Sequence, residues 1–169
     1  MVKKSALAVL LVGAMAFCSF QLLDGATVSW GLQSPSPPFE EAMDASTTLQ
    51  TEFAVRHTDL YAVELNYRFD RRSQAERDAA WSFAGGNASG ASLHAEVEIN
   101  KISDTKIRLL HETVQKPKLT SWGAGVLSSE LAARRLTPGK YNLRVKLVGG
   151  PPPPGIGLTV SVSKAYRGK

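Results

Sequence analysis

The chain has a single cysteine, Cys18, so it cannot form an intrachain disulfide. A chain of 169 residues needs none. A folded part of about 140 residues buries roughly two-thirds of its unfolded surface, which is enough for one stable core.

A strong charge of one sign is also missing. The net charge is +5, from 20 Lys and Arg against 15 Asp and Glu, and two of the cations are Lys3 and Lys4 near the start. The densest basic groups are Arg71-Arg72, Arg134-Arg135 and residues 164–169, scattered among acids. We interpret them as solvated faces, and we expect no nucleic-acid partner.

No hydrophobic run is long enough to span a bilayer as a helix. Residues 5–15 are small and apolar, follow Lys3 and Lys4, and end in the A-x-A site Ala14-Met15-Ala16. This pattern predicts a signal peptide over residues 1–16, no retained transmembrane helix, and a periplasmic or secreted product.

Lipidation at Cys18 is the less favoured alternative. A lipoprotein keeps a cysteine at the cleavage point, directly after a small residue, but Phe17 precedes Cys18 here. We therefore expect membrane attachment only if Cys18 is acylated.

Recognisable catalytic and metal-binding patterns are absent as well. His57, His94 and His111 are far apart, and none has a second ligand at metal spacing, so we expect no metal site and no cofactor. Glu96 and Glu98 fall about 7 Å apart on one strand face. That resembles a glycosidase pair only in distance, and a solvated strand face is the favoured interpretation.

Serine and phosphate-binding motifs are missing too. Ser121, Ser128 and Ser129 lack a G-x-S-x-G context, and no glycine-rich phosphate loop follows a strand. The sequence therefore predicts a protein that is not an enzyme.

Strict alternation is what the sequence does have. In residues 61–70, every odd position is large and apolar, namely Tyr61, Val63, Leu65, Tyr67 and Phe69. Period two predicts a β-strand with these side chains in the core, so Tyr61 and Tyr67 are expected to be structural.

Several other segments show the same period. We expect strands over residues 49–55, 93–99, 141–147 and 156–162. Residues 105–114 form a further strand of ambiguous facing, because Leu109 and Leu110 fit opposite registers. Residues 126–136 fit a strand or, in part, a helical turn. The first strand, 49–55, is expected to meet the 61–69 strand as a hairpin or across a sandwich, and residues 149–154 to form a hairpin tip.

One helix is expected. Ser73 and Glu76 have the spacing of a capping box, which predicts a helix from about Gln74 to Phe83 ending at Gly85-Gly86. About seven strands with one inserted helix predict a two-sheet, immunoglobulin/fibronectin-like all-β sandwich.

A turn at Pro138-Gly139 precedes Tyr141. This arrangement resembles the tyrosine corner of immunoglobulin-like sandwiches, so these residues are expected to be structural. The expected organisation is a Pro-rich, weakly ordered leader over residues 17–45, a sandwich domain over 46–166 and a basic tail over 167–169.

The segment most suited to binding is Thr120-Ser121-Trp122-Gly123, which we expect in a loop. Two interpretations of Trp122 stay open: an exposed interface anchor, or a plug over one end of the core.

Several motifs together are similar to a bacterial domain-of-unknown-function family (number 5625) of small exported proteins, many of them lipoproteins. The resemblance covers about residues 49–166 and rests on these segments: Phe53-x-Val55, the strand 61–69, Gln74-Ala75-Glu76-Arg77, Leu119-Thr120-Ser121-Trp122-Gly123 and Leu136-x-Pro138-Gly139-x-Tyr141-x-Leu143. It implies a sandwich-like envelope domain without catalytic residues. It also suggests an immunity role beside toxic secreted effectors.

We therefore expect a non-catalytic exported binding module whose partner is an unknown protein, with a toxic effector as one candidate. The alternative is a cell-envelope glycan- or lipid-binding module that uses Trp81 and Trp122. A hydrolase is the least favoured class.

Overall fold

A computed structural model describes residues 35–86, 91, 93–103 and 107–165. All of them belong to the second of two compact units into which the chain divides, residues 34–169. The expected signal peptide, Cys18, most of the expected leader and the basic tail lie outside the described residues.

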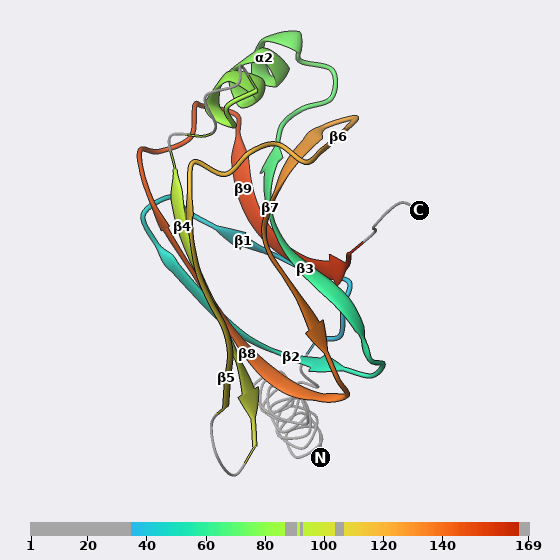
Figure 1. Cartoon of the computed structure of the whole chain (residues 1–169). Helices are drawn as coiled ribbons and strands as arrows, with labels where there is room; N and C mark the ends of the chain where they lie inside the picture. The colour runs from blue at the N-terminus through green and yellow to red at the C-terminus, as the bar shows by residue number, and fades with distance from the viewer. Residues whose placement is uncertain (1–34, 87–90, 92, 104–106, 166–169) are drawn as a thin grey trace, which may run out of the picture. The chain divides into compact units, whose positions relative to one another are not determined.

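The described residues form two antiparallel sheets and one helix (Figure 1). The first sheet has five strands, in the order β1 (Phe39–Met43), β9 (Gly157–Lys164), β3 (Asp59–Arg68), β7 (Val126–Leu136) and β6 (Ser121–Gly123). The second has four, in the order β2 (Thr48–Val55), β8 (Gly139–Val148), β4 (His94–Ile102) and β5 (Ile107–Gln115). The helix, α2, spans Gln74–Phe83. The expected all-β two-sheet sandwich is confirmed.

Strand β3 lies between β9 and β7 and supplies the centre of the core. Tyr61, Val63, Leu65 and Tyr67 are each at most 4% exposed. Alternate residues are buried in the same way in β9, which lies beside β3, and in β4 and β8 of the opposite sheet. The period-two pattern therefore predicted the core faces correctly.

The structure has nine strands in its described part instead of about seven. One additional strand, β1, falls in the expected leader, where it pairs with β9 from Phe39↔Val162 to Met43↔Leu158. Its apolar alternation is interrupted by Glu41, whose carboxylate accepts a hydrogen bond from Thr51 Oγ1 at 2.7 Å. That charged position concealed the strand, so the ordered sandwich begins before residue 46.

The second additional strand, β6, was expected to be a loop. Ser121, Trp122 and Gly123 pair with Ser128, Leu127 and Val126 of β7. Residues 126–136 are a strand throughout, which removes the helical-turn alternative. A three-residue strand is too short to show a periodic pattern, and only the glycines at its turn marked it.

Most connections in the described chain cross from one sheet to the other, and two of them correct sequence-based expectations. Strands β2 and β3 lie in different sheets, so they face each other across the sandwich and do not form a hairpin. Strands β8 and β9 also lie in different sheets, so the expectation of a hairpin tip at 149–154 was wrong. This proline-rich connection spans from one sheet to the other, a distance that a tight hairpin turn does not cover.

The ambiguous facing of β5 is resolved by a bulge. Ile99 pairs with Leu110, and Asn100 pairs with Arg108, so Leu109 is the additional residue. Leu110 is buried against the core, whereas Leu109 is partly exposed. The bulge adds one residue to β5, so both adjacent leucines contact the core: Leu110 is buried in it, and Leu109 packs against it in part.

Two tyrosines fasten strand beginnings to the preceding turn. Tyr141 Oη donates to the carbonyl oxygen of Thr137 at 2.6 Å, the bond that a tyrosine corner requires. Tyr61 Oη donates to the carbonyl oxygen of His57 at 3.0 Å, a second bond of the same kind that the sequence did not reveal.

Within the described residues, no helix is both long enough and apolar enough to cross a membrane.

Replacing Tyr141 by Phe should lower the free energy of unfolding by about 0.5–1.5 kcal/mol, because the hydrogen bond from its hydroxyl to the carbonyl oxygen of Thr137 is lost. Tyr61→Phe is the matched variant and should cost no more, since its bond is longer. Urea unfolding of the two variants measures both values. A Tyr141→Phe protein as stable as wild type would show that the corner bond contributes nothing.

Candidate functional site

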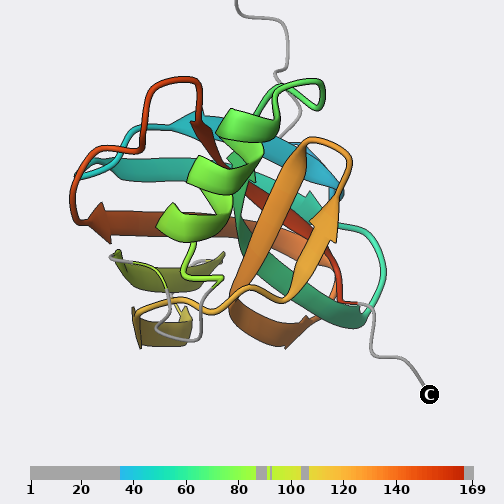
Figure 2. The same ribbon diagram turned by 90° about the horizontal axis from the view of Figure 1, so that it is seen from above.

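The helix α2 and the β6–β7 hairpin lie side by side at one end of the sandwich (Figure 2). Trp81 of α2 and Trp122 of β6 meet there in an edge-to-face contact, with ring centroids 6.5 Å apart and an interplanar angle of 70°. Arg71, Arg72 and Arg77 lie on or directly before the same helix. We call these five residues the tryptophan face.

Trp122 is the most exposed large apolar side chain among the described residues, at 70%. This exposure excludes the core-plug interpretation and leaves the exposed anchor. An aromatic side chain of this size in water is typical of an interaction site, because it offers much apolar area at little entropic cost.

Thr120 holds the end of β6 in place. Its N–H donates to Ser128 O at 2.8 Å, and its hydroxyl oxygen accepts from Glu130 N at 3.0 Å. Ser121 and Gly123, which the sequence also assigned to binding, are exposed on either side of Trp122. The structure thus brings the four predicted residues together, with Thr120 supporting the hairpin and Trp122 presenting the large side chain.

The indole of Trp81 is fixed by the end of its own helix. Gly85 adopts φ 76°, Gly85 N donates to Ser82 O, and Gly86 N donates to Trp81 O at 2.8 Å. This is a Schellman ending, as the two glycines predicted. A Cβ on Gly86 would lie 2.1 Å from Trp81 Nε1, so the indole packs directly over the glycine.

The start of the helix is fixed by a bonded loop. Ser73 Oγ accepts from Glu76 N at 3.2 Å, which is one half of the expected capping box. The other half differs: Glu76 Oε2 accepts from Asp70 N at 2.8 Å, because Ser73 N already donates to Asp70 O. Asp70 Oδ1 in turn accepts from Arg72 N at 2.9 Å. The backbone that carries Arg71 and Arg72 is therefore held by three hydrogen bonds.

The β6–β7 turn and the β8–β9 connection also make contacts at this end of the sandwich. Phe69 N donates to Gly125 O at 3.1 Å, which ties the β6–β7 turn to the loop before α2. A Cβ on Gly155 would lie 2.8 Å from Glu76 Cδ, so the β8–β9 connection also contacts the helix. The end of the sandwich is consequently a preorganised surface, and preorganisation lowers the entropic cost of binding.

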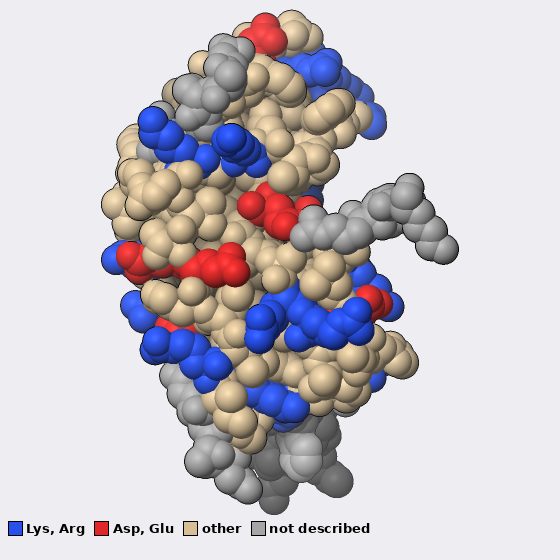
Figure 3. Space-filling view, viewed as in Figure 1, with Lys and Arg blue, Asp and Glu red and all other residues tan. Residues whose placement is uncertain are grey.

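Positive charge accompanies the two tryptophans. Arg71, Arg72 and Arg77 are exposed, and none forms an ion pair within the part of the chain that the structure describes. Figure 3 shows Lys and Arg atoms gathered at the upper right, over the end that carries α2 and β6. Sequence reasoning treated Arg71-Arg72 as an ordinary solvated face. The one feature of the sequence that pointed to these two arginines is their position directly before the helix that carries Trp81.

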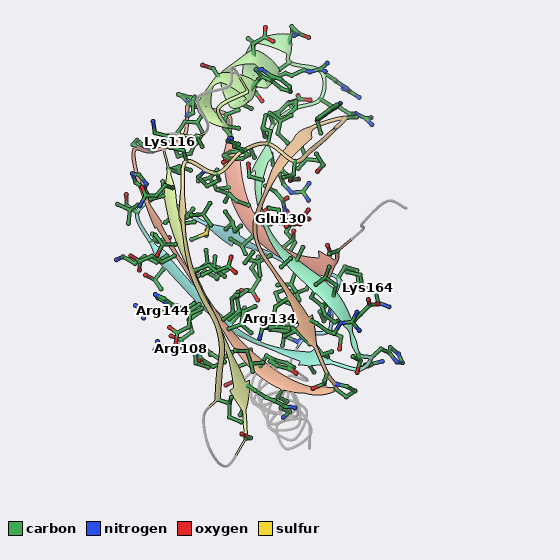
Figure 4. The ribbon with its side chains drawn as sticks, viewed as in Figure 1. Arg108, Lys116, Glu130, Arg134, Arg144 and Lys164 are labelled. Atoms are coloured by element: carbon green, nitrogen blue, oxygen red, sulfur yellow. The ribbon has the colours of Figure 1, made fainter. Side chains whose placement is uncertain are left out.

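The other candidate residues lie elsewhere. Glu96 and Glu98 are on the outer face of the second sheet, 3.6 Å from Lys146 Nζ and 3.3 Å from Arg108 Nε respectively. Figure 4 shows Arg108 and Arg144 on this side, and Arg144 pairs in register with Glu98. A depression of about 30 Å³ lies among these side chains, room for no more than a few waters.

The histidines do not converge on one site. His94 is on β4, His111 is on β5, and His57 lies in the turn before β3. Among the described residues, no three His, Cys, Asp or Glu side chains gather as metal ligands would.

The outer face of the first sheet carries two opposed carboxylates. Glu64 of β3 pairs in register with Glu130 of β7, which Figure 4 labels. Burial, and to a lesser extent the charge of Glu130, raise the pKa of Glu64 above its usual value. On the same face, hydrogen bonding and ion pairing with Arg68 lower the pKa of Glu40.

A family model described as Domain of unknown function (DUF5625) matches residues 37–163. Among curated proteins, no sequence matches the chain. A crystal structure of a protein from Sulfurospirillum deleyianum is similar, with a TM-score of 0.61 and 16% identity over 77% of this chain and 98% of that one. At this identity the likeness shows the fold alone.

Two further solved structures match with a TM-score of 0.31 each. A β-glucosidase from Paenibacillus barengoltzii is 11% identical, over 75% of this chain and 10% of that one. The VP2 subviral particle of infectious bursal disease virus is 10% identical, over 76% of this chain and 31% of that one. Neither likeness is strong enough to support an argument.

Gly86→Ala should displace the Trp81 indole and separate it from Trp122, because no side chain can occupy a position 2.1 Å from the ring. We expect a loss of near-ultraviolet tryptophan ellipticity and a stability cost of about 1–3 kcal/mol. Gly150→Ala is the control, since nothing lies within 4 Å of its added Cβ. A Gly86→Ala spectrum identical to that of the control would contradict the packing described here.

Glu64→Gln should stabilise the protein at neutral pH. The folded-state pKa of Glu64 lies above its unfolded value, so the wild-type protein loses stability as the pH rises through the interval between them. The glutamine side chain does not ionise, so the variant does not lose this stability. Urea unfolding of both proteins at acidic and neutral pH measures the difference in the free energy of unfolding. Glu52→Gln, on the exposed side of β2, should leave stability almost unchanged. A Glu64→Gln protein that is less stable at neutral pH would show that the carboxylate is favourable where it stands.

Proposed function

The chain belongs to the family of the Domain of unknown function (DUF5625), and we propose that it is a non-catalytic, exported β-sandwich that recognises another protein through its tryptophan face. The observation that carries this proposal is Trp122, 70% exposed on a hairpin that several hydrogen bonds hold in place.

The composition of this surface supports protein recognition. Tryptophan and arginine are the residues most enriched among those that dominate protein–protein binding energies, and here two tryptophans and three arginines lie together. The preorganised backbone around them lowers the cost of ordering the surface on binding.

The first partner to test is a secreted antibacterial effector, which would make the protein an immunity protein. That candidate comes from the resemblance of the sequence to small exported proteins that accompany such effectors. A cell-envelope glycan or lipid is the alternative ligand. It has less support, because the rings of Trp81 and Trp122 meet at an interplanar angle of 70° and so do not form together the flat platform on which a sugar stacks.

Trp122→Ala should abolish stable partner binding. We would use the full chain, tagged at its C-terminus, as bait in the native envelope fraction, and then reconstitute any stoichiometric complex from purified components. Loss of a central tryptophan should raise the dissociation constant at least about thirty-fold.

Ile107→Ala is the matched control, because Ile107 is also exposed, at 48%, but lies at the β4–β5 turn. It should bind as wild type does. A complex that forms equally well with Trp122→Ala would refute the proposed face, and retention of glycans or lipids alone would favour the alternative ligand.

A further inference from the structure

We infer that the partner presents an acidic segment to the tryptophan face, with carboxylates that meet Arg71, Arg72 and Arg77 around an apolar group that packs on Trp122. This inference rests on the proposed protein recognition and adds the chemistry of the partner. Three observations carry it.

The first is where the cations lie. Arg77 precedes Trp81 by four residues, so the two side chains share one side of α2. Arg71 is beside the β6–β7 turn, since its Cβ is 3.5 Å from the position that a Cβ on Gly125 would take. Positive charge therefore borders the two tryptophans both on the helix and at the hairpin turn.

The second observation is that Arg71, Arg72 and Arg77 form no ion pair with other described residues of the chain. In the described part of the chain, the ion pairs are formed by Arg68 with Glu40, Arg108 with Glu98, Lys146 with Glu96 and Lys164 with Asp59, all on strands. The three arginines of the tryptophan face are not among them. Their guanidinium groups remain available for carboxylates of another molecule, which they can bind in a bidentate manner.

The third is that the nearby acids are engaged elsewhere. Asp70 accepts from Arg72 N, Glu76 accepts from Asp70 N, and Asp78 accepts from Gln74 Nε2 at 2.8 Å. These carboxylates orient the loop and the helix, and none of them binds one of the three guanidinium groups.

An acidic protein segment fits this surface better than an anionic membrane does. Trp122 is the only large apolar side chain of α2 or β6 that is strongly exposed; the others in the described residues are Ile102, Ile107 and Val148, on β4, β5 and β8. One exposed indole buries little apolar area in a bilayer, which is a weak anchor for a membrane surface.

The test uses the purified full chain and a displayed library of random peptides. Wild type should select peptides that combine Asp or Glu with an apolar residue. A selected peptide should bind at least tenfold more weakly to Arg71→Gln/Arg72→Gln/Arg77→Gln, and its affinity for wild type should fall as salt is added.

The matched control is Arg134→Gln/Arg135→Gln/Lys140→Gln, which removes the same charge from exposed positions at the end of β7 and the start of β8. It should bind the peptide as wild type does. Both triple variants should keep the melting temperature of wild type, because all six side chains are exposed.

The other outcomes separate the two proposals. Peptides that need Trp122 but bind equally to both triple variants, or that are neutral or basic, would overturn the acidic partner and leave the proposed function standing. A library that yields no peptide preferring wild type over Trp122→Ala would count against both. Arginine-dependent binding to phosphatidylglycerol vesicles, without any peptide, would assign the face to a membrane and overturn both.

Discussion

The contact on which the candidate site depends is that between Tyr67 of β3 and Phe83 of α2. Their rings meet edge to face, with centroids 6.0 Å apart and an angle of 82°. Tyr67 is fully buried, and burial raises the pKa of its phenol to about 12, with the adjacent Ser129 hydroxyl partly offsetting the effect. The helix is thereby joined to the central strand of the core, and its residue Ala80 and the capping residue Ala84 are buried there too. Through α2, the position of Trp81 and its contact with Trp122 are set by the sandwich itself.

The core was predictable from the sequence because its determinants are local and periodic. The alternation in β3, β4, β8 and β9 fixed which side chains face inward, and the Ser73 and Gly85-Gly86 signals fixed both ends of α2. The strands that the sequence missed lack this repetition. In β1 the inward position Glu41 carries a charge, and its carboxylate accepts a hydrogen bond from Thr51 on the opposite sheet. That partner is ten residues away and becomes visible only once the two sheets are packed.

The candidate site was predictable only in part, for the same reason. Trp122 stood out because it is a large aromatic residue among small and polar ones, but its exposure depends on the pairing of β6 with β7. Trp81 and the three arginines gain significance only from their proximity to that hairpin, and Trp81 and Trp122 are far apart in the sequence. Glu76 illustrates the limit well. The capping-box spacing predicted a bond to Ser73, but the carboxylate bonds Asp70 N instead and so fixes the loop that carries the arginines.

The sheet edges favour recognition through side chains over recognition by strand addition. Strand β5 is an edge of the second sheet, but it contains a bulge, and it carries the charged residue Glu112 at a position paired with buried Val97. Bulges and charged side chains are devices that keep an edge from accepting another strand. At the opposite edge of the second sheet, Ala54 N of β2 donates to Pro35 O. One edge of the first sheet is β1, which has only five residues. These features make the edges poor sites for strand addition, whereas the end of the sandwich offers an exposed indole and three guanidinium groups that form no ion pair within the described residues.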